Sequence, residues 1–376
     1  MRKPFKTIIF TALACTFLLG AGISAEAASK VKINNENFSQ QMKYYAEIGD
    51  SNNDEYLSAK EASKITEIHF ESNENTDIFR GIKYFTNLKN LWFESYADRR
   101  NPEEVTGAEK LNIQKMDLRG LKKLQKLEIE CGNSYLQQID LEGCIGLKEI
   151  YIQGDDNISR INLEQCVNLQ KIYCSQITMD KIKLSGMKKL READLRGLMA
   201  KSVVIKNCPA LERLDLSGHN MTKVKLKNVA NVKDMYLWSK SLTSLDVSGL
   251  SELKKLSCQI PGCISLDVSQ NKNLKILNCN YSDNLREINI KGCKKLKTLR
   301  CNHTSIKKLN VKKNSNLETL QCKQTAINKL NFKNNPKLKR LECNNTNIRE
   351  LDLSNTRIRK SSALKCDPDV TVTYAK

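Results

Sequence analysis

Histidine is scarce in this sequence, which holds only three in 376 residues. His69, His219 and His303 lie far apart, and the chain has no G-x-S-x-G, no H-E-x-x-H and no phosphate-binding glycine loop. An enzyme needs an acid, a base or a nucleophile positioned in one pocket. The sequence therefore predicts a protein that is not an enzyme.

Long apolar runs are missing beyond residue 24. Residues 7–24 are apolar, follow the cationic residues Arg2, Lys3 and Lys6, and precede Ala25-Glu26-Ala27. This arrangement is typical of a secretory signal peptide, which we expect at residues 1–27. A retained membrane anchor is the alternative, but the run is shorter than the ~20 residues of a spanning helix. We expect a secreted or cell-envelope-associated protein with no membrane span after processing, and the C-terminus carries no wall-sorting motif.

Acidic residues are also fewer than basic ones, since the sequence has 42 Asp and Glu against 62 Lys and Arg. Residues 28–110 hold 11 basic and 15 acidic residues, whereas residues 111–376 hold 48 and 26. Such a field attracts polyanions without selecting one of them. Nucleic acid is not an expected partner, because no binding motif for it accompanies the charge.

What the sequence does contain is a repeat of 21 to 23 residues. Within each unit, apolar residues recur at positions 1, 4, 6, 11, 14 and 16. The 4-x-6 spacing predicts a short strand with one buried face. One unit buries little, so the units must stack. The leading residues are Leu88, Leu124, Leu147, Leu169, Leu190, Leu211, Val232, Leu253, Leu274, Leu296, Leu317 and Leu338.

This pattern resembles the leucine-rich repeat, whose leading segment reads LxxLxLxxNxL. The resemblance implies a solenoid of short parallel strands in about twelve to thirteen stacked rungs, with few helices and a small helical N-terminal cap. We assign residues 28–64 to this cap, 65–360 to the solenoid and 361–376 to a C-terminal cap, with an insertion at about 95–109.

Bacterial secreted and surface proteins of the internalin-like kind are the nearest resemblance, and they recognise proteins or glycans. The sequence departs from their pattern at position 9, where Thr304, Thr325 and Thr346 replace the usual Asn. A hydroxyl can still bond the backbone of the turn, so we expect the same fold.

Cysteine recurs in two columns of the repeat. Position 6 holds Cys174, Cys258, Cys279, Cys301, Cys322, Cys343 and Cys366, and the position three residues before the leading leucine holds Cys144, Cys166, Cys208 and Cys293. Both columns alternate with aliphatic residues, which predicts small buried hydrophobic side chains. Disulfides are the alternative in an exported protein, and metal binding is disfavoured because C-x-x-C is absent.

A segment before the repeats, "DSNNDEYLSAKE", resembles an EF-hand loop. Alternate oxygen donors ending in a carboxylate suit a hard cation, so calcium is the one ion the sequence suggests, although no cofactor is required. Glu55 occupies the sixth position, where Gly normally permits the turn. The alternative is a cap that only covers the end of the stack, with Ser58 and Glu61 as a capping box. The candidate ligands are Asp50, Asn52, Asp54, the Tyr56 carbonyl, Ser58 and Glu61.

Positions 5 and 7 should project from the outer face of the strands. They hold Trp92, Tyr151, Tyr173, Tyr236 and Trp238, which we predict to be ligand-binding residues. Cross-strand packing on a solvated face is the alternative. Carboxylates share this face in the early repeats, and Arg300, Lys323 and Arg340 follow in the later ones.

Lysines gather on the returning segments of the repeats, with an interruption at Ser248 and Ser269. A second candidate site, for polyanions, comprises Lys206, Lys227, Lys291, Lys312 and Lys333. The sequence thus favours an exported recognition protein that binds a protein or glycan through its strand face. The alternative is an envelope scaffold or adhesin held by lysines to an anionic cell-wall polymer.

Overall fold

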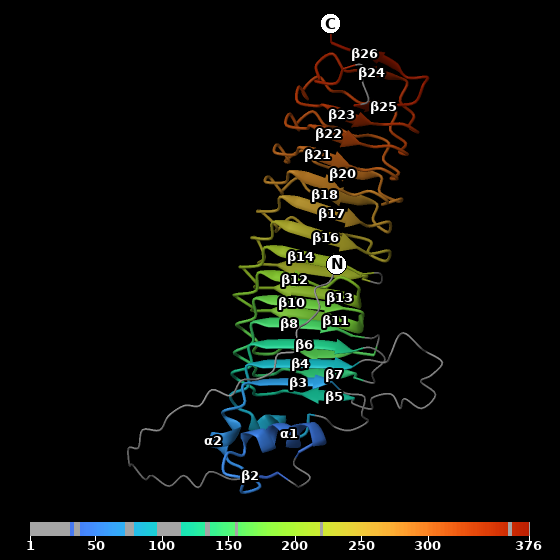
Figure 1. Ribbon diagram of the computed structural model, residues 1–376. Helices are drawn as coiled ribbons and strands as arrows, with labels where there is room; N and C mark the ends of the chain where they lie inside the picture. Colours follow the sequence, from blue (N-terminus) through green and yellow to red (C-terminus); the bar gives the residue numbers. More distant parts are fainter. Residues whose placement is uncertain are drawn as a thin grey trace, which may run out of the picture.

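The computed structural model describes residues 31–33, 38–71, 79–95, 114–131, 136–154, 157–218, 221–359 and 363–375 (Figure 1). The predicted signal peptide and, apart from Ser95, the predicted insertion lie outside these ranges. Within them, no helix has the length and apolar character needed to cross a membrane.

The chain winds into a coil of about 13 turns, called rungs below, which together build a parallel sheet of 14 strands. Alternation of buried and outward residues produces these strands, as in Lys126–Cys131, where Leu127 and Ile129 are buried. The strands are β3 (Glu67–Glu71), β4 (Asn90–Ser95), β6 (Lys126–Cys131), β8 (Glu149–Gln153), β10 (Lys171–Ser175), β12 (Glu192–Asp194), β14 (Arg213–Ser217), β16 (Asp234–Trp238), β17 (Lys255–Gln259), β19 (Ile276–Asn278), β21 (Thr298–Arg300), β22 (Thr319–Gln321), β23 (Arg340–Glu342) and β25 (Leu364–Lys365).

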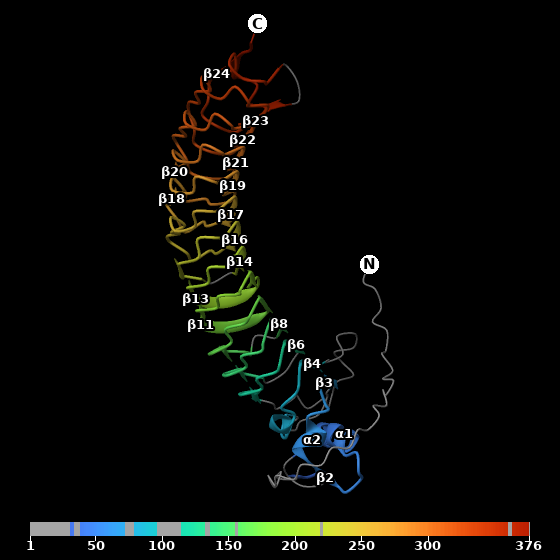
Figure 2. The same cartoon turned by 90° about the vertical axis from the view of Figure 1, so that its left-hand side faces the viewer.

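The returning halves of most rungs form shorter sheets on the opposite side of the stack. Figure 2 shows that the stack curves, with the 14-stranded sheet along its inner side. The large sheet is called the strand face below. The returning strands are β5 (Lys115–Asp117), β7 (Gln138–Asp140), β9 (Arg160–Asn162), β11 (Ile177–Ser185), β13 (Leu198–Lys206), β15 (Lys223–Lys227), β18 (Ser265–Asp267), β20 (Glu287–Asn289), β24 (Glu350–Asp352) and β26 (Thr371–Thr373).

The core between the two sides consists of side-chain columns that repeat from rung to rung. Cys301, Cys322 and Cys343 have no exposed surface and stand in consecutive rungs of the position-6 column. These three thiols are free, and their burial confirms the expectation at these positions, whereas Cys366, which was assigned to the same column, is only partly buried. Burial raises the pKa of the Cys301 thiol to about 12, because a thiolate would lack solvation there.

Asparagine joins the second cysteine column, which sequence analysis had described only as cysteine and aliphatic. Asn271, Asn314 and Asn335 are fully buried, and each Nδ2 donates two hydrogen bonds to backbone carbonyls of the preceding rung at 2.8–3.1 Å. The Cys293 thiol donates to the Val268 carbonyl, the equivalent acceptor, at 3.1 Å. The column therefore accepts residues that can satisfy this carbonyl, in addition to aliphatic ones.

Threonine at position 9 closes the turn after the strand, as expected. The Oγ1 atoms of Thr304, Thr325 and Thr346 donate to the carbonyls of the cysteines three residues before them, at 2.8–2.9 Å. Each hydroxyl thus supplies the turn with a local donor that an asparagine would otherwise provide.

The N-terminal end of the stack is covered by two short helices, α1 (Gln40–Gly49) and α2 (Ala59–Ala62). Between them, β2 (Tyr56–Leu57) pairs antiparallel with β1 (Val31–Lys32). Ser58 caps α2, and its capping box with Glu61 is present as predicted. A 3-10 helix, η1 (Ile82–Tyr84), then leads into β4.

Candidate functional site

The strand face carries three rows of outward side chains, at positions 3, 5 and 7 of the rungs. The parallel register places equivalent residues beside one another, so each row runs along the stack. From β3 to β25, the position-5 row reads His69, Trp92, Glu128, Tyr151, Tyr173, Asp194, Asp215, Tyr236, Ser257, Asn278, Arg300, Gln321, Glu342 and Lys365.

Two of the five predicted ligand-binding aromatics meet in this row. Tyr151 and Tyr173 stack with ring centroids 4.5 Å apart and planes 5° from parallel. The Tyr151 hydroxyl donates to Gln153 Oε1 at 2.8 Å. Partial burial raises the pKa of Tyr151 above its usual value, and the neighbouring Tyr173 adds to the rise. The pair forms a flat, half-buried platform on the strand face.

Tyr236 and Trp238 form a second aromatic group on β16, and both are half-buried. Lys255, in the next strand, donates from Nζ to the Tyr236 hydroxyl at 2.8 Å. Its Nζ lies 4.8 Å from the Tyr236 ring centroid, so the ammonium group sits near the hydroxyl edge and a hydrogen bond describes the contact better than a cation–π interaction.

Trp92 is separated from both groups. Its ring lies 6.4 Å from the His69 ring in an edge contact, and Lys126 Nζ lies 5.8 Å from its centroid. Three rungs separate Trp92 from Tyr173 in the register, a distance of roughly 15 Å at the usual strand spacing. The structure thus distributes the five aromatics over three places along the face.

Charge on the early rungs is more mixed than the sequence suggested. The position-3 row alternates in sign, as Lys126, Glu149, Lys171, Glu192, Arg213, Asp234 and Lys255. Lys171 pairs with Glu149 at 3.3 Å and Arg213 with Glu192 at 3.6 Å. This alternation was not recognised because its members lie about 21 residues apart in the chain.

Between the two aromatic groups lie two carboxylates that share one cation. The Arg196 guanidinium binds both oxygens of Asp194, and its Nε lies 4.0 Å from Asp215 Oδ2. Asp215 Oδ1 accepts a hydrogen bond from the Ser217 amide at 3.0 Å. One guanidinium for two carboxylates leaves an excess of negative charge between the aromatic groups.

The predicted polyanion residues lie on the returning side. Lys206 and Lys227 are register partners at the ends of β13 and β15. The backbone amides of Lys291, Lys312 and Lys333 donate to the asparagine two residues before each, at 3.0–3.3 Å. Ser248 and Ser269 occupy the equivalent turns in the rungs between, beside Asp246 and Asp267. The lysines therefore form two separate groups, divided at Ser248 and Ser269 as the sequence indicated.

The candidate calcium loop lies in the cap. Asp50 accepts hydrogen bonds from the amides of Asp54 (3.3 Å) and Glu55 (2.9 Å), and Glu55 adopts φ 65°, the left-handed conformation that glycine usually supplies. The Glu61 carboxylate accepts from Ser51 and Ser58, whose hydrogen bonds lower its pKa. Among the described residues, no three His, Cys, Asp or Glu side chains are grouped to hold a metal.

Comparison with known proteins identifies the fold. The functional domain of InlJ from Listeria monocytogenes, which includes a cysteine ladder, matches 88% of this chain and 79% of its own, with a TM-score of 0.50 and 19% identity. By fold, the chain is a leucine-rich repeat protein.

Two further structures of this fold class are similar to the chain at lower TM-scores. An internalin (InlF) from Listeria monocytogenes matches 93% of the chain and 98% of its own length, with a TM-score of 0.47 and 16% identity. The leucine-rich repeat protein LIC12759 from Leptospira interrogans matches 84% and 97%, with a TM-score of 0.43 and 19% identity. No protein-family model and no curated protein sequence matches the chain.

Proposed function

We propose that the protein is an exported, non-enzymatic recognition protein that binds a protein or glycan through its strand face. Leucine-rich repeat solenoids are typically binding proteins. The observation that carries the proposal is the arrangement of Tyr173, Asp194, Asp215 and Tyr236 in one row, with an aromatic at each end and the shared guanidinium of Arg196 between.

Aromatic side chains that are already held in place lose little freedom on binding, and for that reason they dominate many interfaces. Tyr173 is held by its stack with Tyr151, and Tyr236 by its hydrogen bond to Lys255. The excess negative charge between them favours a partner with a cationic or hydrogen-bond-donating group at the centre of its contact surface. Tyrosine rings also stack on sugars, so a glycan fits the same face.

The test begins with a partner captured by the mature chain and identified by mass spectrometry, whose affinity is then measured by calorimetry. Tyr236→Ala with Trp238→Ala should weaken binding at least tenfold, because truncating an interface hot spot costs about 2 kcal/mol or more. Tyr44→Ala is the matched control, since it removes an exposed aromatic from helix α1 in the cap. Equal affinity of the double variant and the wild type, with unchanged circular dichroism, would refute the proposal.

A second candidate is an envelope scaffold or adhesin held to an anionic cell-wall polymer. The specific support is the pairing of Lys206 with Lys227, two lysines side by side on the returning side. Bound in this way, the protein would leave isolated cell walls in moderate salt, because exposed ion pairs are screened. Retention at high salt would argue against it.

A further inference from the structure

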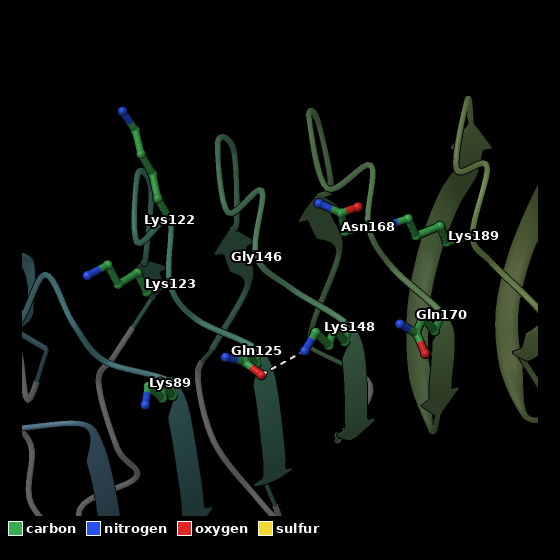
Figure 3. Close-up of a pocket in the computed structure, with 9 residues that line it drawn as sticks. All are labelled: Lys89, Lys122, Lys123, Gln125, Gly146, Lys148, Asn168, Gln170 and Lys189. Carbon is green, nitrogen blue, oxygen red and sulfur yellow. Dashed lines mark hydrogen bonds between the residues drawn. The ribbon is translucent and has the colours of Figure 1, made fainter.

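A hollow of about 350 Å³ lies at the edge of the stack where the chain turns into the strands of the large sheet (Figure 3). Five lysines line it: Lys89, Lys122, Lys123, Lys148 and Lys189. No carboxylate lines it. These residues could not be recognised as a group in the sequence, because they are spread over about a hundred residues and occupy three different positions relative to the leading leucines.

One wall of the hollow is a column of residues that immediately precede the strands. Backbone hydrogen bonds of 2.7–2.8 Å link Lys89, Gln125, Lys148, Gln170 and Arg191 in succession. Cation and amide therefore alternate along this wall. Successive residues are one strand spacing apart, so the cations repeat at about 10 Å, twice that spacing.

The other wall is the turn before each strand, where Gly146 opens the space. In this column Gly146 stands between Lys123 and Asn168. A Cβ atom on Gly146 would lie 2.4 Å from the Lys122 carbonyl oxygen, so the close approach of the two turns requires glycine. Figure 3 shows Gly146 in the turn above Gln125 and Lys148, without a side chain over the hollow.

The charge of the hollow is not neutralised within the described part of the chain. None of the five lysines has a carboxylate partner there, whereas Lys233, Lys297 and Lys339 are paired with Glu212 or Glu318. Lys148 instead donates to Gln125 Oε1 at 2.9 Å, and Lys123 to Asn87 Oδ1 at 2.6 Å. Glu212, which follows Arg191, is the first carboxylate in the column.

We infer that this hollow binds a linear acidic polysaccharide that carries an anionic group on alternate sugars. A chain lying along the stack meets a cation of this column at every second rung. That repeat of about 10 Å is comparable to the length of a disaccharide unit. The amides of Gln125, Asn168 and Gln170 lie between the cations, where they can donate to and accept from sugar hydroxyls.

This inference rests on the second candidate function, binding of an anionic polymer, and assigns that binding to a different surface. The probe is a short hyaluronate oligosaccharide, which has a carboxylate on alternate sugars, measured by calorimetry in low salt. Lys123→Ala with Lys148→Ala should weaken binding roughly tenfold, since each exposed cation contributes modestly. The variant's circular dichroism and melting temperature should match those of the wild type.

Two control variants distinguish the possible results. Lys254→Ala with Lys275→Ala removes two lysines from the same column outside the hollow, and Lys206→Ala with Lys227→Ala removes the pair on the returning side. Lys254→Ala with Lys275→Ala should bind hyaluronate within twofold of the wild type, and Lys206→Ala with Lys227→Ala should lose less affinity than Lys123→Ala with Lys148→Ala. Equal losses in all three variants would overturn the assignment to the hollow, and a loss confined to Lys206 and Lys227 would overturn it while leaving the second candidate function intact.

Two other ligands test the spacing. A neutral chitin oligosaccharide should not bind, and inorganic polyphosphate should bind less tightly than hyaluronate at equal charge concentration. Stronger binding of polyphosphate would overturn the inference in favour of simple charge attraction. Absence of hyaluronate binding by the wild type would overturn it as well.

Discussion

The rings of Tyr151 and Tyr173 lie parallel at 4.5 Å, although 22 residues separate them in the chain. They meet because β8 and β10 are neighbours whose register pairs the two residues directly. The same register brings every position-5 side chain against its equivalents in the neighbouring strands. Side-chain contacts on the strand face therefore form between neighbouring rungs, so pairs of substitutions can test them.

The tyrosine pair should behave as an energetic unit. We expect a coupling of about 0.5–1.5 kcal/mol between Tyr151→Ala and Tyr173→Ala in a double-mutant cycle, which is the usual contribution of an aromatic pair beyond its burial. Urea denaturation of the four proteins measures it. Tyr151→Ala with Tyr236→Ala is the control, because these residues are four rungs apart and should be additive. Additivity of Tyr151 and Tyr173 would show that the stack contributes nothing to stability.

The buried thiols should make the protein sensitive to alkali. The pKa of Cys301 is raised by burial to about 12, whereas an unfolded thiol has a pKa of about 8.5. Above that lower value the unfolded chain loses a proton that the folded chain keeps. The contribution of the thiol to the free energy of unfolding is therefore complete at neutral pH and falls as the pH rises toward 12. The fall is about 1.4 kcal/mol per pH unit for each such thiol.

Because lysines and tyrosines also titrate in this range, a difference between variants isolates the thiol. Cys301→Val keeps an apolar side chain in the column and should reduce the alkaline slope of the free energy of unfolding by the contribution of one thiol. Denaturation at several values between pH 8 and pH 10.5 checks this. Equal slopes for Cys301→Val and the wild type would mean that Cys301 ionises as readily in the folded state as in the unfolded one.

Two glycines at the same position of different rungs should respond differently to a methyl group. A Cβ on Gly292 would lie 1.7 Å from the Ser269 carbonyl oxygen, whereas a Cβ on Gly249 has nothing within 4 Å. Gly292→Ala should destabilise the protein by about 1–3 kcal/mol, as overpacking does. Gly249→Ala is the matched control and should be neutral or slightly stabilising. Equal urea denaturation midpoints for Gly292→Ala and Gly249→Ala would show that neighbouring rungs can move apart at this turn.

Calcium binding in the cap is a separate hypothesis. If the loop from Asp50 to Glu61 takes up calcium, millimolar CaCl₂ should raise the melting temperature of the wild type, because a ligand that binds only the folded state stabilises it. Asp50→Asn with Asp54→Asn should abolish the rise, since two of the charged donors are lost. Magnesium serves as the control cation and should have a smaller effect. A wild-type protein that gives no calcium shift and no heat of binding would exclude the site.

Much of the fold follows from spacing in the chain. The recurrence of Leu296, Leu299 and Cys301 at positions 1, 4 and 6 predicts a strand with one buried face, and the structure confirms all three as fully buried. Ser58 and Glu61 predict the start of α2, because a capping box depends on residues only three apart. Local patterns of this kind can be read from the sequence since the interacting groups are close along the chain.

Charge partners were less accessible to sequence analysis. Arg213 and Glu192 were separated by a full repeat, and each could have faced several other residues. The buried Asn335 donates to two carbonyls of the preceding rung, a contact that the sequence did not predict. These contacts depend on the register between neighbouring rungs, and a shift of a few ångströms would replace them with others.

The sequence by itself determined that the chain is a stack of rungs with the repeat cysteines from Cys144 to Cys343 inside, because a period of about 21 residues buries the same set of side chains in every turn. Only the tertiary structure decided which surface residues become neighbours. Register placed Tyr151 on Tyr173, and the missing side chain of Gly146 opened a hollow among five lysines. The reason is that a buried position can be recognised from the residue type at one place in the repeat. A surface site depends instead on the distances between side chains of different rungs.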